Sequence, residues 1–482
     1  MIFDNIINYP NMDTNKAIII GSGPAGISLA IELEKKKIQS IILEAGEFDY
    51  SEDSQKFYKT EVVGDHLVDA IEYTRLRMFG GTSVHWGGTC RTLDDSDFKN
   101  WPISKKDLNQ YVDRAAKILD IKNPNFREKK INENLKIVEF QNSIDLKEPE
   151  LRIPVNFGEK YKEIINKSKN IDLILRSPVT KIIGRNKLAQ NVEINYLGQK
   201  YYLKGKKYIL ATGGIENSRI LLWSKEKNNS LINNDLPIGK YWISHPWIIG
   251  GVGFLYKSKI KKILNEKFIN YDGPMHIATN SELVNEKEIL SGAMYMNAKE
   301  DTKLYKEVIK DLLCVAPEYG KKIARSIFGK DLKCGNIFMN LEEPPKESNR
   351  VSLDKKVIDK NGVPITNLYY KKSKETLNSA KTILVELGKL FVEKDIGRIA
   401  LKSEIENLED YENLGVHHHM GGTRIGTNLK TSVVDSNLKL HDLKNCYILG
   451  SSVFTTGGYS NPTFSIVQLA LRLANHLGPK II

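Results

Sequence analysis

The fold of this chain is decided by the stretch Ala17-Ile18-Ile19-Ile20-Gly21-Ser22-Gly23-Pro24-Ala25-Gly26. An apolar run followed by G-x-G-x-x-G predicts a buried strand, a tight glycine turn and a helix whose N-terminus points at a pyrophosphate. A second apolar run, residues 40–43, ends at Glu44-Ala45, where the Glu44 carboxylate is placed to accept hydrogen bonds from a ribose. Because strand, helix and distal acid are all present, a dinucleotide-binding domain is favoured over an unrelated glycine-rich turn. The motif alone does not separate NAD from FAD.

Length and composition indicate a globular chain with more than one lobe. Its 482 residues exceed what one hydrophobic core usually holds, and 41% of them are hydrophobic. No apolar run reaches the roughly 18 residues of a membrane span. Residues 1–10 carry no basic, apolar or twin-arginine export signal. We therefore expect two lobes, no membrane span and a cytoplasmic location.

Charge and cysteine content argue against several classes of function. The net charge of +12 comes from lysines that are spread along the chain and mixed with acids, which is typical of a solvated face and not of a nucleic-acid groove. Cys90, Cys314, Cys334 and Cys446 are scattered without a C-x-x-C pair, so we expect no disulfide framework, no zinc site and no dithiol redox centre. A small-molecule substrate is favoured over a polynucleotide.

Two further glycine clusters are predicted to approach the same ligand. The first is Gly80-Gly81-Thr82-Ser83-Val84-His85-Trp86-Gly87-Gly88, whose glycines argue against a stable helix or strand and indicate a loop shaped by what it touches. The second is Ala211-Thr212-Gly213-Gly214, where an apolar strand again breaks at glycines before a helix. Val179, in the strand before, is placed to reach an adenine edge.

The middle of the chain is predicted to form a second lobe. From about residue 226 to 405 the strand–glycine–helix pattern is lost, and helices at 303–316 and 371–392 mix with strands such as 334–341. Asn361-Gly362, between polar and apolar segments, predicts a tight turn.

Three adjacent histidines, His417, His418 and His419, precede Met420-Gly421-Gly422-Thr423-Arg424. Adjacent side chains point in different directions, so one metal ion cannot easily bind all three, and no acid or cysteine completes a metal site. We expect His417 and His418 to be ordinary hydrogen-bonded histidines. His419 stands against the Gly-Gly turn, where crowding is least, and is the candidate to face a ligand.

The last candidate segment is Ser460-Asn461-Pro462-Thr463, which opens an apolar helix predicted over 464–477. Pro462 suits the first helical turn, and Asn461 is a natural N-cap. The positive end of this helix would also favour negative charge on a redox ring lying over it. Asn461 is therefore a candidate both for the cap and for the catalytic centre.

Taken in order, these motifs resemble those of the glucose-methanol-choline (GMC) flavoprotein oxidoreductases, above all the branch that contains pyranose 2-oxidase and the sugar and polyol dehydrogenases. The match covers roughly the first 245 residues and the last 75, and the middle lobe resembles the family only at residues 348–353. The resemblance implies an α/β fold with a Rossmann-like FAD-binding domain, as in p-hydroxybenzoate hydroxylase, formed by residues 1–235 and 408–482. Residues 236–407 are then expected to form an α+β substrate-binding domain on a mixed or antiparallel sheet.

The resemblance also implies FAD as the cofactor and oxidation of an alcohol by hydride transfer to flavin N5. His419 matches the family histidine that takes the hydroxyl proton, and Asn461 matches the second member of the family pair, which positions the hydroxyl. His85 aligns with the histidine that carries the covalent flavin bond in pyranose 2-oxidase, so a covalent link is an open alternative. Gly450-Ser451 is expected beside the cofactor, with Gly450 in place of the aspartate of many family members.

These implications lead to one expected function with two alternatives. We expect oxidation of a secondary alcohol of a sugar or sugar derivative to a ketone, by a dehydrogenase in preference to an oxidase. The alternatives are oxidation of a nonsugar alcohol such as a sterol or polyol, and a flavin-binding protein without catalysis, against which the intact His419 and Asn461 argue. The sequence leaves the electron acceptor and the oligomeric state open.

Overall fold

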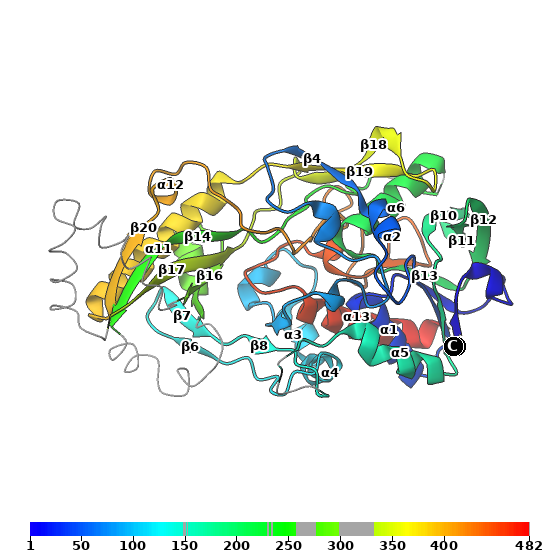
Figure 1. The fold of residues 1–482 in the computed structure, drawn as a ribbon, viewed down its shortest axis with the longest axis horizontal. Coiled ribbons are helices and arrows are strands. Elements are labelled where there is room, and N and C mark those ends of the chain that lie inside the picture. Colours follow the sequence, from blue (N-terminus) through cyan, green and yellow to red (C-terminus); the bar gives the residue numbers. More distant parts are fainter. Residues whose placement is uncertain are drawn as a thin grey trace.

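The computed structural model describes residues 1–147, 151, 153–228, 231–232, 235–256, 276–297 and 332–481, which form two lobes side by side (Figure 1). One lobe is built on a parallel sheet and the other on an antiparallel sheet backed by a long helix. This architecture confirms the expected α/β fold with a second domain on an antiparallel sheet.

The first lobe is centred on a six-stranded parallel sheet in the order β1-β9-β3-β2-β13-β21. Its strands are β1 (Ile2–Phe3), β2 (Ala17–Ile20), β3 (Ser40–Leu43), β9 (Ile171–Ile174), β13 (Lys207–Leu210) and β21 (Cys446–Ile448). Every residue of β2 and β3 is buried, which explains why both read as continuous apolar runs. Helix α13 (Thr463–Ile481) packs on α1 (Pro24–Lys35), so the last helix covers the first.

The second lobe is built on a seven-stranded antiparallel sheet in the order β20-β14-β17-β16-β15-β7-β6. Its strands are β6 (Glu128–Lys130), β7 (Leu135–Val138), β14 (Trp247–Tyr256), β15 (His276–Thr279), β16 (Gly292–Asn297), β17 (Leu332–Leu341) and β20 (Gly397–Leu401). Helix α11 (Lys374–Glu393) lies along this sheet (Figure 1) and contributes Leu377, Ala380, Leu384 and Leu387 to the shared core. Their spacing of three or four positions is that of an amphipathic helix with one buried face.

Two parts of the chain depart from the predicted domain boundaries. Strands β6 and β7 come from before residue 235, yet they pair in the sheet of the second lobe. Strand β19 (Pro364–Tyr370) falls within the predicted 236–407 domain but pairs in parallel with β4 (Thr60–Gly64) of the first lobe, and its partner β18 (Arg350–Ile358) packs on α6 (Gly213–Lys227). These pairings join segments far apart in the chain, so no local pattern reports them.

Several local predictions for the middle of the chain can be compared with the structure. The tight turn at Asn361-Gly362 is confirmed, since Gly362 has a φ of +75° between β18 and β19. The predicted strand over 334–341 is part of β17, and the predicted helix over 371–392 is α11. The helix predicted over 303–316 lies outside the described residues.

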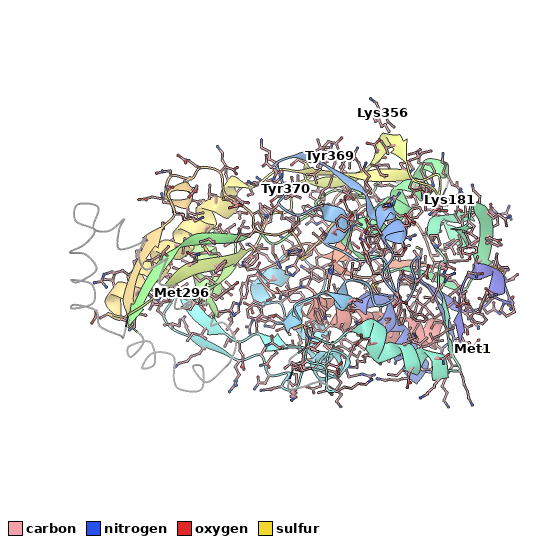
Figure 2. The ribbon with its side chains drawn as sticks, in the orientation of Figure 1. Met1, Lys181, Met296, Lys356, Tyr369 and Tyr370 are labelled. Atoms are coloured by element: carbon pink, nitrogen blue, oxygen red, sulfur yellow. The ribbon has the colours of Figure 1, made fainter. Side chains whose placement is uncertain are left out.

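Strand β19 links the fold to the region of the three histidines. Successive strand residues face opposite sides, so Tyr369 and Tyr370, both labelled in Figure 2, have different neighbours. Tyr369 meets the guanidinium of Arg350 at 4.0 Å, while Tyr370 is 2% exposed and packs edge-on against Trp242. Trp242 in turn packs against the ring of His419.

Elsewhere the described elements are α2 (Glu52–Gln55), α3 (Lys105–Asn109), α4 (Val112–Ile118), α5 (Phe157–Lys167), α8 (Ser281–Glu286), α12 (Ser403–Glu406), β5 (Thr89–Cys90), β8 (Gln141–Asn142) and the antiparallel β10 (Val179–Arg185), β11 (Leu188–Tyr196) and β12 (Gln199–Lys204).

None of the helices that the structure describes is long and apolar enough to cross a membrane. Within the same residues, no three His, Cys, Asp or Glu side chains are grouped so that they could hold a metal ion. Cys90 and Cys446 are buried free thiols.

Candidate active site

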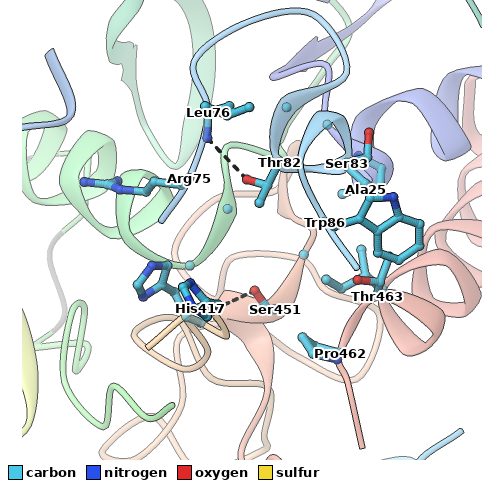
Figure 3. A pocket seen from close by; sticks show the side chains of 18 of the residues that line it. Ala25, Arg75, Leu76, Thr82, Ser83, Trp86, His417, Ser451, Pro462 and Thr463 are labelled. Carbon is cyan, nitrogen blue, oxygen red and sulfur yellow. Dashed lines mark hydrogen bonds between the residues drawn. The ribbon is translucent and has the colours of Figure 1, made fainter. Parts of the chain in front are cut away.

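A cavity of about 990 Å³ lies where the two lobes meet, at the carboxyl ends of β2, β3 and β13. Open α/β sheets bind their ligands at this edge. Around one part of the cavity stand Ala25 from α1, Trp86 from the second glycine cluster and Pro462 before α13 (Figure 3). Three segments that are distant in the sequence therefore share one wall.

Nearly all residues that the sequence predicts at the cofactor line this cavity. They are Gly21, Ser22, Gly23, Pro24, Ala25, Glu44, Ala45, Gly81, Thr82, Ser83, His85, Trp86, Gly87, Gly88, Val179, Ala211, Thr212, Gly213, Gly450, Ser451, Asn461, Pro462 and Thr463. Gly26 and Gly80 are not among the lining residues. A Cβ on Gly26 would stand 2.0 Å from the carbonyl oxygen of Gly21, and one on Gly80 would stand 2.5 Å from the backbone nitrogen of Gly158, so both glycines permit close backbone packing.

The glycine turns leave room for a ligand that approaches the backbone. A Cβ built on Gly23, Gly87 or Gly213 would meet nothing within 4 Å. Gly23 is the N-cap of α1, and its φ of −74° suits any residue, so its own backbone does not require glycine. Space kept free at a helix N-terminus explains this glycine, and the pyrophosphate of FAD fits such a cradle.

Glu44 is held beside this cradle by the first glycine turn. Its carboxylate accepts hydrogen bonds from the backbone N–H groups of Ser22 at 3.2 Å and Gly46 at 2.7 Å, and from the hydroxyl of Ser22. The Glu44 side chain is buried and lines the cavity. A carboxylate has about four acceptor positions, so Glu44 keeps capacity for the ribose hydroxyls that the sequence predicts there.

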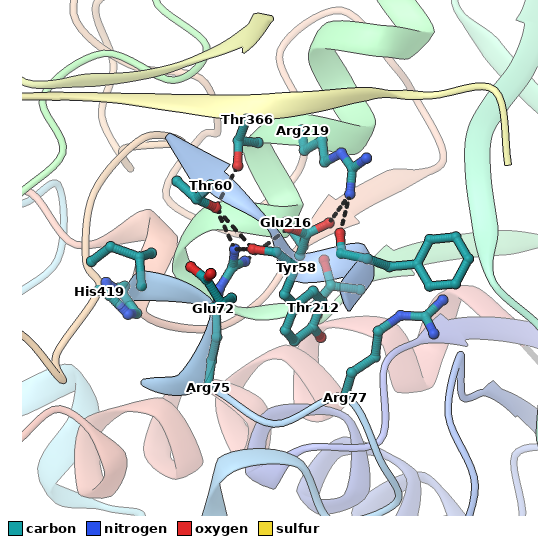
Figure 4. Close-up of polar contacts among 12 residues, drawn as sticks. Tyr58, Thr60, Glu72, Arg75, Arg77, Thr212, Glu216, Arg219, Thr366 and His419 are labelled. Carbon is teal, nitrogen blue, oxygen red and sulfur yellow. Dashed lines mark hydrogen bonds and ion pairs between the residues drawn. The ribbon is translucent and has the colours of Figure 1, made fainter. Parts of the chain in front are cut away.

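A buried charge network, which the sequence analysis missed, forms another part of the wall (Figure 4). The Arg75 guanidinium lies 2.8 Å from Glu216 on α6, and Arg219 contacts Glu216 at 3.4 Å and Asp359 at 2.7 Å. Burial tends to raise the pKa of Glu216, but Arg219 and Arg75 outweigh burial, so the pKa is lowered and the carboxylate stays charged. Arg77 is buried on the same wall, where burial lowers its pKa. Two arginines, Arg75 and Arg219, thus balance two acids, Glu216 and Asp359, and Arg77 lies beside them on the same wall.

The three adjacent histidines have three different environments. His417 is exposed, and its Nε2 lies 3.5 Å from a carboxylate oxygen of Asp69. His418 is half-buried, and its Nδ1 lies 2.9 Å from Nδ1 of His245. His419 is 7% exposed, and its Nε2 lies 2.7 Å from the hydroxyl oxygen of Thr74. The backbone of His419 is fixed as well, since the Ser451 hydroxyl donates to its carbonyl at 2.6 Å.

The surroundings of His419 argue against its predicted role as general base. The Thr74 hydroxyl donates to the carbonyl of Ile71 at 2.9 Å, so Nε2 of His419 carries the hydrogen in its own contact with Thr74. Its other nitrogen, Nδ1, is shielded from solvent without a hydrogen-bond partner. Burial, with Arg75 and His417, lowers the pKa of His419 to about 3, so this ring, like that of His418, is neutral at neutral pH. The positions of its two nitrogens, and not its pKa, therefore argue against His419 as the base.

His418 is better placed than His419 to act as the base. It lines the cavity, and burial, followed by the effect of His245, lowers its pKa well below the usual range, so the ring is neutral at neutral pH. Adjacent residues on an extended chain face opposite sides. The sequence analysis predicts His419, and not His418, to face the ligand, and a difference of one residue in register reverses this assignment.

Asn461 lines the cavity but does not cap the helix that follows. Helix α13 begins at Thr463, and Pro462 accepts the first helical bond, from Ile466 at 2.9 Å. The Asn461 amide nitrogen instead donates to the carbonyl of Thr89 at 2.8 Å. This bond fastens the residue to β5 and leaves one amide hydrogen and the amide oxygen for other partners.

The second lobe contributes a largely aromatic wall, which the sequence analysis did not identify. Trp247, His276, Tyr295 and Asn340 line the cavity from β14, β15, β16 and β17. The rings of Trp247 and Tyr295 both stack on Phe338, at 5.6 and 5.3 Å between centroids. Alternate residues of neighbouring strands meet on one face of a sheet, and that long-range register is not readable from a single segment.

A glycine-lined cavity at the carboxyl edge of a parallel sheet, closed by an antiparallel sheet, is the arrangement expected of a two-lobed dinucleotide-binding protein. Residues 345–470 match the model of the C-terminal domain of the GMC oxidoreductases. The family resemblance predicted from the sequence is thereby confirmed.

Solved structures share the fold over almost the whole chain. Pyridoxine 4-oxidase from Mesorbium loti superposes with a TM-score of 0.63 at 14% identity, covering 96% of this chain and 99% of the other. Formate oxidase superposes with a TM-score of 0.57 at 14% identity, covering 98% and 99%. At this identity the likeness concerns the fold alone.

Curated relatives match parts of the chain. A 2-methyl-1,2-propanediol dehydrogenase of Mycolicibacterium austroafricanum is 25% identical over 301 residues, which is 58% of this chain and 49% of the relative. The fructose dehydrogenase large subunit of Gluconobacter japonicus is 23% identical over 58% and 48%, and a C-glycoside 3-oxidase of Arthrobacter globiformis is 22% identical over 66% and 55%. The matched regions thus span about half the length of these relatives.

Proposed function

We propose that this protein is an FAD-dependent oxidoreductase that oxidises a CH–OH group, with His418 as the base that takes the hydroxyl proton. The observation that carries the proposal is the position of His418 in one cavity with the glycine cradle on one side and the second-lobe wall on the other. When bound, FAD would accept the hydride from the substrate carbon. The remaining chemistry belongs to this chain, which must bind the alcohol, orient it and remove its proton.

The state of His418 suits a proton acceptor. Its low pKa keeps the ring neutral, and Nδ1 is engaged with His245, so Nε2 is the nitrogen available to a substrate hydroxyl. A base within hydrogen-bond reach of the hydroxyl contributes about 10²- to 10⁴-fold to the rate of such a reaction. His418 therefore replaces His419 in the role predicted from the sequence.

Asn461 is proposed to hold the alcohol oxygen. Its amide is anchored to Thr89, so the remaining amide hydrogen has a fixed direction. A fixed donor that binds the substrate oxygen sets the angle at which the C–H bond faces the cofactor, and this contribution is geometric.

A secondary alcohol of a sugar or sugar derivative is the proposed substrate, oxidised to a ketone. The relatives named above include enzymes of fructose, a C-glycoside and a diol, and the aromatic wall offers flat apolar faces with polar edges to a similarly amphipathic ring. Dehydrogenase activity is preferred to oxidase activity, and a cytoplasmic location is part of the proposal on sequence grounds alone. A nonsugar alcohol such as a sterol or polyol is the second candidate, because the diol dehydrogenase relative favours it.

Anaerobic stopped-flow measurement of flavin bleaching tests this proposal. The purified protein is mixed with a panel of monosaccharides, glycosides, polyols and sterols, and air is then admitted. Bleaching by a sugar with slow recovery in air supports a sugar dehydrogenase, and fast recovery with peroxide supports an oxidase. If no alcohol bleaches the flavin, a flavin-binding protein without catalysis is the better description.

The variants His418→Gln and His419→Gln separate the two candidate bases. His418→Gln should keep the bound flavin and lose at least about 100-fold in the rate of bleaching. His419→Gln should reduce that rate far less. The reverse order would restore His419 as the base.

A further inference from the structure

The His418 ring has a buried neighbour that controls its orientation. His245 is 2% exposed, and it follows Ser244 just before β14. Its Nδ1 lies 2.9 Å from Nδ1 of His418, and the two rings are nearly perpendicular, at 86°. The contact between the two nitrogens is a hydrogen bond, so one ring must donate and the other must accept.

A backbone carbonyl decides which ring donates. Nε2 of His245 lies 3.3 Å from the carbonyl oxygen of Gly457, and a carbonyl oxygen only accepts, so this nitrogen carries the hydrogen of the His245 ring. A neutral imidazole has one N–H, so Nδ1 of His245 holds a lone pair. It follows that Nδ1–H of His418 is the donor and that Nε2 of His418 holds a lone pair. The opposite arrangement would set the lone pair of Nε2 in His245 against the carbonyl oxygen.

The argument requires both rings to be neutral, and their surroundings agree. Burial lowers the pKa of His245 to about 4, against an opposing effect from the carbonyls of Gly457 and Gly458. Around His418, after burial itself, the groups that shift its pKa are His245, His417 and His419, and all of them lower it. Glu343 accepts the N–H of Ser244 at 3.1 Å, and burial raises the pKa of this carboxyl to about 8, so it too is mostly neutral at neutral pH.

We infer that His245 is a positioning residue that fixes the tautomer of His418, so that the lone pair on Nε2 of His418 is available to the substrate hydroxyl. This inference rests on the proposed function, in which His418 is the base. In the reaction the hydroxyl proton moves to Nε2 of His418, the C–H hydride leaves to the cofactor, and no proton leaves His245. The imidazolium formed on His418 keeps its Nδ1–H bond to His245, so its charge is stabilised by a neutral acceptor that is oriented by Gly457.

Two variants of His245 test its two hydrogen bonds separately. In His245→Asn the side-chain oxygen reaches the place of Nδ1, so the acceptor for His418 is kept and the bond to Gly457 is lost. In His245→Gln the amide nitrogen reaches the place of Nε2, so the bond to Gly457 is kept and the acceptor is lost. His441→Asn serves as control, since His441 is a half-buried histidine that contacts Ser432 at 3.0 Å outside the cavity.

The rate constant of flavin reduction at saturating substrate is the first readout. We expect His245→Gln to lower it by about 100-fold, because His418 then takes the wrong tautomer, and His245→Asn to lower it by less than about 10-fold. Substrate affinity, flavin content and unfolding temperature should stay near those of the control. The acidic limb of the pH profile should move to lower pH in His245→Gln, because the imidazolium of His418 has lost its acceptor. A merely structural role would not move this limb or be rescued by Asn.

Ring ¹⁵N spectra of histidine-labelled protein give a second readout that needs no substrate. The signals of the two rings are assigned from their loss in His245→Asn and His418→Gln. The proposal requires a hydrogen on Nδ1 of His418 and on Nε2 of His245 in the wild-type protein. A hydrogen on Nε2 of His418 overturns it, and so does a His245→Gln variant with the reduction rate and pH profile of the control. If instead His418→Gln bleaches like the wild type, the proposed base is wrong, while the spectra still decide the tautomers.

Discussion

Alanine substitution of two glycines in the same motif should separate folding from cofactor binding. In Gly26→Ala the new Cβ would stand 2.0 Å from the carbonyl oxygen of Gly21 and 3.2 Å from Cγ2 of Ile19. Overpacking a core site costs about 1–3 kcal/mol, and the upper end applies because backbone cannot rotate away. Alanine recovers about 1 kcal/mol of helix propensity. We therefore expect Gly26→Ala to lower the free energy of unfolding by about 2 kcal/mol.

Gly23→Ala should instead weaken FAD binding and leave the free energy of unfolding nearly unchanged. Its Cβ meets nothing within 4 Å, and its backbone already suits alanine, so the only cost to folding is that of replacing an N-cap glycine, at most about 1 kcal/mol. The same Cβ occupies the space in which a phosphate would meet the first N–H groups of α1. Loss of one charge-assisted hydrogen bond is worth about 1.5–3 kcal/mol, which corresponds to about a 10- to 150-fold weaker affinity for FAD.

Urea unfolding of flavin-free protein and titration with FAD test the pair. The flavin must be removed first, because a ligand that binds only the folded state stabilises it by mass action and would mix the two effects. Gly21 is not a suitable control, since its φ of +103° makes any side chain there strained. If Gly26→Ala unfolds like the wild type, Gly26 is not needed for backbone packing. If Gly23→Ala binds FAD like the wild type, Gly23 does not keep space for the cofactor.

Three further predictions concern charge, pH and the covalent link. Glu216→Gln should lower the free energy of unfolding by about 3–5 kcal/mol, because Arg75 and Arg219 lose the partner of a buried pair. Since the pKa of Glu216 is lowered in the folded state, this contribution is present above the unfolded pKa and is lost as pH falls through the folded pKa. Urea unfolding curves at several pH values would show this loss. The raised pKa of Glu343, about 8 against 4.5, means that stability falls as pH rises between these values, and Glu343→Gln should remove that part of the fall; an unchanged pH slope would contradict the burial argument. If His85 carries no covalent bond, acid-denatured protein should release yellow flavin into the supernatant, whereas a coloured pellet would support the link.

The sequence predicted best where a role depends on neighbours along the chain. Each glycine motif, namely the turn between β2 and α1 and the two later clusters, can be recognised from a few adjacent residues. Nearly all residues of these motifs line the cavity. Positions that depend on distant partners were not predictable. The pairing of β4 with β19 and the entry of β7 into the second sheet have no local signal. The choice between His418 and His419 depends on Thr74 and His245, which lie far from both in the sequence. The N-cap predicted for Asn461 was wrong because α13 begins at Thr463, so that Pro462 and not Asn461 directly precedes the helix.

The place of β21 at the edge of the parallel sheet has a consequence for synthesis. The strand pairs with β13, which is made more than two hundred residues earlier, and α13 covers α1 from the start of the chain. A nascent chain on the ribosome would therefore hold an uncovered first helix and an open strand edge until β21 and α13 emerge. Chaperone protection is most needed in that interval.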